Sequence, residues 1–286
     1  MDCQRIANVI GRDGTRVAMW VVVILACLAW TPAALAGTPK HPNSDVLEQA
    51  WKYQLQYRSG NLDIVPEYVA LLEEATKAEP NDAELWYQMG VAYLAQAARA
   101  LQPGGNPADA MAPMTKGPRA LWRATQIKPD HAEALAQLGG VQTMLGPVLQ
   151  KPEMVTRGVT QMNRAVELAP HSKRARLQRA FSGLMLPDSL RNHAAEAEDL
   201  DFLMDIAAWT RAGDYVILLR ADLYFETGKP DLARALYEIV EQSGTTAPSD
   251  AAKARLAALE KDGVPMSEIK ALRMAAGANC AMCHGN

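Results

Sequence analysis

The chain has 286 residues, a formal net charge of −3, and 49% hydrophobic against 21% charged residues. This composition supports a buried core and excludes a disordered or collagen-like chain. The mild acidity, without a block of basic residues, argues against nucleic acid as a partner.

Residues 1–36 are predicted to form an export signal. Arginines at positions 5, 12 and 16 precede an apolar run over 17–30, and Ala34-Leu35-Ala36 then resembles a small-x-small cleavage site. Cleavage would place the mature chain in the periplasm, with residues 37–44 as a linker. Two alternatives stay open: an uncleaved leader that anchors the chain in the inner membrane, or lipid attachment at Cys27.

Removal of the leader would take away Cys3 and Cys27 and leave Cys280 and Cys283 as the mature chain's thiols. Because the leader holds three arginines and two aspartates, Lys+Arg would fall from 29 to 26 and Asp+Glu from 32 to 30, a net charge of −4. A disulfide framework is thereby excluded, although the expected compartment is oxidising.

Two prolines, Pro80 and Pro129, are followed by the same helix-start pattern. Asn81 or Asp130 comes directly after the proline, and Glu84 or Glu133 stands three residues further on. This spacing predicts a side-chain cap paired with a carboxylate that reaches back to the helix start.

The segment that follows Pro80 resembles the tetratricopeptide repeat (TPR), a pair of antiparallel helices. Trp86, Met89, Gly90 and Tyr93 match the first-helix signature of that family with Met in place of Leu, and the next unit repeats part of it at Leu135, Leu138 and Gly139. The resemblance implies an all-α, TPR-like solenoid of helical hairpins over residues 45–243. It also implies a surface that binds protein.

Further features support that repeat. Ala75, Ala124 and Ala165 each stand five residues before a proline, where a small side chain allows close helix packing. We expect Gly139-Gly140 to be a helix-packing position and not a nucleotide loop. A later unit has a short turn at 227–229. Its characteristic residues all stand at the expected intervals: Ala221, Tyr224, Gly228, Ala233, Tyr237 and Val240.

The proline spacings of 49 and 41 residues exceed the 34 of the family, and we place the surplus between the paired helices, at 102–107 and at Gly146-Pro147. Met111 and Met114 would then belong to a flexible cover over a groove, with soft copper ligation as the alternative. Residues 45–79 are predicted to be an opening cap. Residues 173–209 are less regular, with a break at Pro187 and a helix from Ala194 to Trp209.

Two C-terminal helices are expected near 249–262 and 266–276, within a segment 244–276 that follows the repeats. No stretch alternates apolar and polar residues as a strand would.

Residues 277–286 contain Cys280-Ala281-Met282-Cys283-His284, the spacing of a c-type haem attachment site. Two thiols at this spacing can bond to the two vinyl groups of one porphyrin, and the adjacent imidazole can ligate the iron. We therefore expect Cys280 and Cys283 to hold one covalent haem c and His284 to be the proximal iron ligand. A dithiol redox pair, half of a zinc site or a chance match are the alternatives.

The segment 277–285 resembles the start of a small class I cytochrome c, a family in which further residues close the haem pocket and supply a distal ligand. Because this chain ends at Asn286, we expect the repeats or a partner to cover the haem's other face. The distal ligand is left unassigned. Its candidates are His41, His131, His171, His193 and methionines such as Met266 and Met274; capping or surface roles are favoured for His131 and His171.

These features together predict an exported scaffold that docks a redox protein and transfers single electrons through its haem. The alternative is a TPR assembly factor for a cytochrome or respiratory complex, without its own redox turnover. Enzymatic turnover of peroxide or gas binding at an open iron position is a third, less favoured hypothesis. The chain would meet a membrane only through its leader.

Overall fold

The computed structural model describes residues 43–58, 60–102, 104–207, 212–244, 246–260, 268–269 and 271. These residues form helices and connecting turns, and none of them lies in a strand. The all-α prediction is therefore confirmed. The described residues from Asp45 onward belong to one compact unit.

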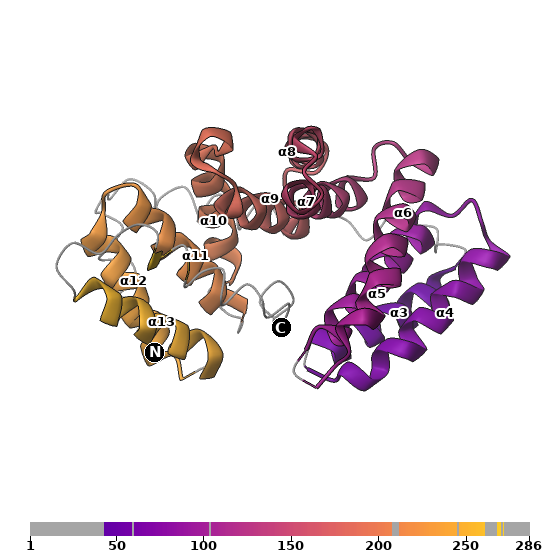
Figure 1. Ribbon diagram of the computed structural model, residues 1–286, viewed down its shortest axis with the longest axis horizontal. Helices are drawn as coiled ribbons and strands as arrows, with labels where there is room; N and C mark the ends of the chain where they lie inside the picture. The colour runs from indigo at the N-terminus through magenta and orange to yellow at the C-terminus, as the bar shows by residue number, and fades with distance from the viewer. Residues whose placement is uncertain are drawn as a thin grey trace, which may run out of the picture. The chain divides into compact units, whose positions relative to one another are not determined.

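Most of the helices pair into consecutive hairpins (Figure 1). The first helices of the hairpins are α3 (Ser44–Arg58), α5 (Ala83–Ala100), α7 (Ala132–Val148), α9 (Lys173–Met185) and α11 (Ala212–Glu226). The second helices are α4 (Val65–Ala78), α6 (Met111–Ile127), α8 (Pro152–Leu168), α10 (His193–Ala207) and α12 (Pro230–Gln242). The helix α13 (Thr246–Leu259) follows, and short 3₁₀ turns η2 (Leu62–Ile64), η3 (Pro107–Ala110) and η4 (Asp188–Leu190) lie in three of the connections.

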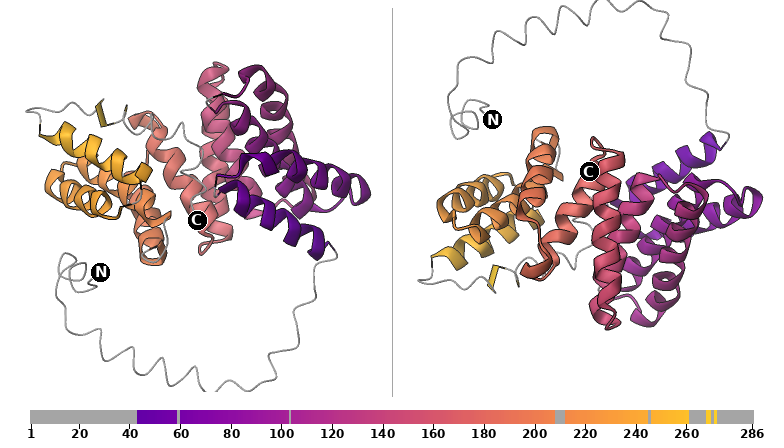
Figure 2. Two further views of the ribbon diagram at one scale, coloured as in Figure 1. Left: turned by 90° about the horizontal axis from the view of Figure 1, so that it is seen from below. Right: turned by 90° about the horizontal axis from the view of Figure 1, so that it is seen from above.

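Each hairpin packs against the next along the chain, as α4 does on α5, α6 on α7 and α10 on α11. The three views of Figures 1 and 2 agree that α5 and α6, and likewise α7 and α8, lie side by side. A core built in this way is a series of local clusters shared by neighbouring hairpins. This arrangement is a helical-hairpin solenoid.

Most of the signature residues are buried where the hairpins meet, and Trp86 is partly buried. Met89 is 1% exposed and Tyr93 is buried in a cluster with α3 and α4, while the Trp86 ring nitrogen donates a 2.9 Å hydrogen bond to the Pro80 carbonyl. Ala124 and Ala165 are fully buried, as their positions before the prolines predicted, whereas Ala75 is only partly buried. The repeat signature thus identifies residues that hold the hairpins together.

Glycines allow the closest approach, which is between α7 and α8. A Cβ added to Gly139 would lie 2.6 Å from the Gly158 carbonyl oxygen, and one added to Gly158 would lie 2.5 Å from the Gly139 carbonyl oxygen. Contacts of that length with backbone atoms cannot be relieved by turning a side chain. The prediction that Gly139-Gly140 is a packing position is confirmed.

The helix caps lie one residue later than the sequence pattern indicated. Asp82 caps α5 by accepting hydrogen bonds from the backbone N–H groups of Glu84 and Leu85, at 3.0 and 3.2 Å. His131 caps α7, so the prediction of Asn81 and Asp130 as caps was wrong. Neither predicted reaching carboxylate closes a capping box. Glu84 instead accepts from Gln88 and pairs with His131, and Glu133 accepts from Arg174.

The first surplus lies partly between the paired helices as predicted, because residues 101–110 separate α5 from α6. The second surplus instead lengthens the helices, because only residues 149–151 separate α7 from α8. Met111 and Met114 lie in the first turn of α6, so the predicted flexible cover was wrong. Gly146 and Pro147, expected to break the chain, belong to the last turn of α7. A side chain at position 146 is excluded because α8 is close: a Cβ on Gly146 would meet the Val155 side chain at 2.6 Å.

The predictions for the part of the chain after residue 173 agree with the described residues. The turn 227–229 joins α11 to α12, with Gly228 at a φ of 76°, and Ala221, Ala233, Tyr237 and Val240 are fully buried. The break at Pro187 precedes η4, and α10 occupies the predicted helix up to Ala207. The helix expected near 249–262 is α13, whereas most of the one expected at 266–276 lies outside the described residues.

Candidate functional site

The first helices of four consecutive hairpins contribute side chains to one polar cluster. We define the Arg174 cluster as Trp51 and Gln54 of α3, Tyr87 of α5, Glu133 of α7 and Arg174 of α9. Because these first helices pack into shared core clusters, the residues of the Arg174 cluster meet although they are far apart in sequence.

The Arg174 guanidinium is the centre of the cluster. Its Nη1 donates to the Tyr87 hydroxyl at 3.1 Å and to Glu133 Oε2 at 3.3 Å, and its Nη2 donates to Gln54 Oε1 at 3.0 Å. The guanidinium carbon also lies 5.0 Å from the centre of the Trp51 ring, within cation–π range. One side chain therefore contacts residues from three other helices.

A second polar pair lies beside it. His131 Nε2 lies 3.1 Å from Glu84 Oε2, while His131 Nδ1 accepts the hydrogen bond that caps α7. The imidazole centre also lies 5.1 Å from the Tyr87 ring centre. Both ring nitrogens of His131 thus have partners within the fold, and Tyr87 connects this pair to the Arg174 cluster.

The environment favours the charged state of Glu84 and Arg174. Burial alone would raise the pKa of Glu84, but hydrogen bonds from His131 and Gln88 and the charge of Arg174 lower it below its ordinary value. Burial would lower the pKa of Arg174, but Tyr87 and Glu133 raise it above its ordinary value. Burial raises the pKa of the Tyr87 hydroxyl, which keeps it a neutral donor and acceptor. This arrangement suits binding more than proton transfer.

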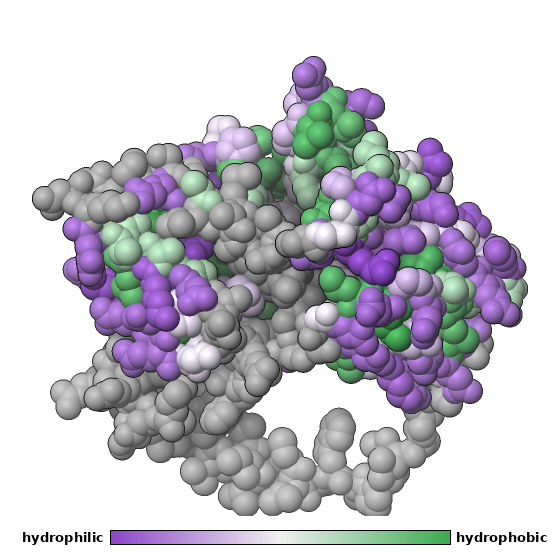
Figure 3. Space-filling view, turned by 60° about the horizontal axis from the view of Figure 1, so that its bottom comes forward, coloured by the Kyte–Doolittle hydropathy of each residue, from purple (hydrophilic) through white to green (hydrophobic). Residues whose placement is uncertain are grey.

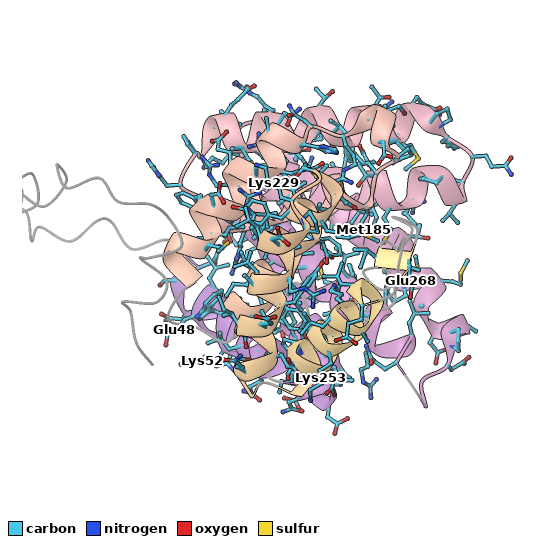
Figure 4. All side chains as sticks on the ribbon, turned by 90° about the vertical axis from the view of Figure 1, so that its left-hand side faces the viewer. Glu48, Lys52, Met185, Lys229, Lys253 and Glu268 are labelled. Carbon is cyan, nitrogen blue, oxygen red and sulfur yellow. The ribbon has the colours of Figure 1, made fainter. Side chains whose placement is uncertain are left out.

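Apolar and charged side chains of α3 extend the site to the surface. Trp51 and Leu55 are 41% and 38% exposed, one turn apart. On the same helix Glu48 and Lys52 form an ion pair with 2.8 Å between Oε1 and Nζ, and both are labelled in Figure 4. An exposed indole next to a fixed guanidinium can contact a protein ligand through both apolar and charged groups.

The residues predicted to hold haem, Cys280, Cys283 and His284, lie outside the described residues, as do His41, Met266 and Met274. Of the other distal-ligand candidates, His171 is exposed in the turn before α9 and His193 is exposed at the start of α10. The capping role predicted for His131 and the surface role predicted for His171 are confirmed.

Among the described residues, no three His, Cys, Asp or Glu side chains are placed to hold a metal ion together. Nor does any helix in that part of the chain combine the length and the apolar character needed to cross a membrane. The predicted leader is not included in either finding.

Sequence reasoning missed the Arg174 cluster because its members carry no local motif. Gln54 and Arg174 are 120 residues apart, and a polar residue on a helix gives no sign of which other helix it contacts. One signal could have suggested the cluster: all four of its helices are the first helices of their hairpins, and first helices occupy equivalent places in a repeat array.

No family model and no curated protein sequence matches this chain. Solved structures do. The chain is similar to TTC0263, a thermophilic TPR protein in Thermus thermophilus, with 16% identity over 75% of this chain and 97% of that one, and a TM-score of 0.52.

Two further structures are less similar. The MamA protein matches with 15% identity, 78% and 98% coverage of the two chains and a TM-score of 0.40. A tetratricopeptide repeat protein from Parabacteroides merdae ATCC 43184 matches with 19% identity, 81% and 98% coverage and a TM-score of 0.39. The hairpin order, the buried signature residues and the likeness to the Thermus protein agree that this chain has an all-α, TPR-like solenoid fold.

Proposed function

We propose that this chain is an exported TPR-like scaffold that binds a redox protein and carries one covalent haem c for single-electron transfer. The observation on which the proposal depends is the sequence Cys280-Ala281-Met282-Cys283-His284 on a helical-repeat chain. The leader predicted at residues 1–36 would bring the chain to the compartment where c-type haem is attached.

The donor set fits haem c by its chemistry. Two thiols at this spacing match the two vinyl groups of a porphyrin, and an imidazole next to the second thiol is a common iron ligand. Zinc fits less well, because a structural site needs four ligands and Cys280 and Cys283 are the thiols that remain after cleavage. When bound, the haem would supply one-electron exchange.

The docking role is supported by the fold and by the surface of α3. Repeat arrays bind proteins on extended surfaces. Here the Arg174 cluster places a charged guanidinium beside the exposed indole of Trp51, and Trp and Arg are enriched among residues that dominate protein interfaces. We therefore assign the face that contains Trp51 and Arg174 to partner binding.

The intact mass of the purified protein tests the cofactor. The full chain would be produced in bacteria that contain the c-type haem maturation machinery, and its mass and reduced absorption spectrum would be measured. We expect the mass of residues 37–286 plus one haem, with a c-type band. The double variant Cys280→Ala, Cys283→Ala should lose both.

Cys27→Ala is the matched control, because it removes a thiol from the leader and should leave the haem in place. A protein that weighs only as much as its amino acids would contradict the proposal and favour the haem-free assembly factor. A band that persists in the double variant would contradict covalent attachment at these thiols.

A further inference from the structure

The outward face of α6 carries a row of three apolar side chains with one threonine between them, which is called the apolar row. Met111, Thr115, Pro118 and Trp122 follow one another at the i, i+4, i+7, i+11 spacing that places residues on one side of a helix. Met111 is 69% exposed and Trp122 is 55% exposed, whereas the opposite side of α6 is buried against α5. Two large apolar side chains therefore lie at the two ends of an exposed row.

A basic row lies next to it on the same helix. Lys116, Arg119 and Arg123 are spaced i, i+3, i+7, so they also share one side of the helix. That side is rotated from the apolar row by about 100°, the rotation between consecutive residues. The sequence of α6 contains no Asp or Glu. On a chain whose net charge is −3, this helix is locally cationic.

Two of the three cations keep their charge available. Lys116 lies 3.6 Å from Glu73 Oε1, which offsets its charge. Arg123 donates only to neutral groups, the Asn81 side-chain oxygen at 3.2 Å and the Pro80 carbonyl at 3.5 Å. Arg119 is exposed and makes no ion pair with any residue that the structure describes.

Exposed apolar side chains occur elsewhere as well, but in different surroundings. Figure 3 shows hydrophobic side chains in separate patches among hydrophilic ones on the face it presents. At the end of α7, Met144, Val148 and Leu149 are exposed, but no cluster of cations accompanies them on that helix. The combination of Trp, Met and unneutralised Arg on one helical face is found on α6.

We propose that this face of α6 binds an acidic amphipathic helix of a partner protein. Arg119 and Arg123 are one turn apart and match two carboxylates one turn apart on the partner, each able to accept paired N–H groups from a guanidinium. Trp122 and Met111 bury the partner's apolar side chains. These residues lie on a second helix, whereas those of the Arg174 cluster lie on first helices, so this surface would add a second docking site to the array.

A protein fits this surface better than an anionic membrane does. Lipid-binding clusters hold roughly four to eight basic residues, more than the two available here. Both available cations are arginines, whose planar fork recognises carboxylates with a geometry that a lysine lacks.

The probe is a fluorescently labelled helical peptide of about 18 residues, with leucines along one side and glutamates one turn apart beside them. Its counterpart carries lysine in place of every glutamate. We expect the acidic peptide to bind the full-length protein, and its affinity to fall by about tenfold or more for Arg119→Glu and for Trp122→Ala. Raising NaCl from about 50 to about 300 mM should weaken this binding.

Arg157→Glu is the matched control, because Arg157 is an exposed arginine of the neighbouring second helix α8 and the charge change is identical. The affinity of the Arg157→Glu variant for the acidic peptide should stay within about twofold of that of the unchanged protein. Circular dichroism should show that all variants are folded. The proposal is overturned if the lysine peptide binds as well as the acidic one, or if Arg157→Glu weakens binding as much as Arg119→Glu.

Two further results would also overturn it. One is binding of phosphatidylserine vesicles that Arg119→Glu abolishes while the acidic peptide does not bind at all. The other is a dimer in sedimentation that Arg119→Glu dissociates, which would make a second copy of this chain the occupant.

Discussion

The Arg174 guanidinium and the Gln54 side-chain oxygen lie 3.0 Å apart, although one belongs to the fourth hairpin and the other to the first. The same guanidinium contacts Tyr87 and Glu133 from the two hairpins between them. The extensive helix contacts of the described residues join neighbouring hairpins, so such a side chain couples the stability of non-adjacent repeats.

Arg174→Ala should therefore destabilise the fold by about 2 kcal/mol, because the buried Tyr87 hydroxyl and the buried Gln54 side-chain oxygen both lose the guanidinium donor. Urea unfolding would measure the change in free energy. The unfolding transition should also broaden, since the hairpins would unfold less cooperatively. Arg164→Ala is the control: its ion pair with Glu167 is exposed on α8, and its loss should cost less than about 0.5 kcal/mol.

The pH dependence of stability should report the Glu84–His131 pair. Hydrogen bonds from His131 and Gln88 outweigh burial and lower the folded-state pKa of Glu84 below 4.5. The contribution of Glu84 is then fully present above 4.5 and is lost as the pH falls through the folded-state pKa. Acid should destabilise the protein in that range.

Thermal unfolding between about pH 6 and pH 3 would measure this effect. Glu84→Gln should reduce the loss of stability in acid relative to the unchanged chain. Glu74→Gln is the control, since Glu74 is an exposed carboxylate on α4. If both variants have the same acid profile as the unchanged protein, the role assigned to Glu84 is wrong.

Replacing Gly139 should strain the contact between α7 and α8. The added Cβ of Gly139→Ala would lie 2.6 Å from the Gly158 carbonyl oxygen, and relief requires the two helix backbones to move apart. We expect a loss of about 2–3 kcal/mol in the free energy of unfolding. Asn163→Ala, on the exposed side of α8, should have almost no effect, and an equal loss in both variants would contradict the close-packing explanation.

The sequence predicted the fold in those elements whose cause is local. Pro80 and Pro129 follow the ends of α4 and α6. The signature at Trp86, Met89 and Gly90 recurs in the next unit, so the hairpins and their order could be inferred. The caps were assigned one residue early because Asn81 and Asp82 are both good capping residues. Adjacent candidates of that kind cannot be ranked without the backbone geometry.

The lengths of the second and third hairpins were harder to predict. Gly146 and Pro147 look like a breaker in isolation, but the glycine makes room for Val155 on the facing helix, and a proline is tolerated in the last turn of α7. The Arg174 cluster depends entirely on contacts between repeats. Those contacts are set by how the hairpins stack, which a single local pattern does not encode.

The turn that ends α7 offers a route to a more stable protein. Gln150 has a φ of 55°, the left-handed conformation that costs a residue with a Cβ roughly 1 kcal/mol. The geometry is that of a Schellman motif: the Lys151 N–H donates to the Gly146 carbonyl at 2.8 Å and the Gln150 N–H donates to the Pro147 carbonyl at 3.1 Å. Both bonds use backbone groups, so they do not need the glutamine side chain.

Gln150→Gly should therefore raise the free energy of unfolding by about 0.5 kcal/mol, once the greater freedom of glycine in the unfolded chain is subtracted. Urea or thermal unfolding would detect the gain. Asn163→Gly, at an exposed position in the interior of α8, should instead destabilise the protein by about 1 kcal/mol. A loss of stability in Gln150→Gly would show that the glutamine side chain stabilises this turn by more than its backbone conformation costs.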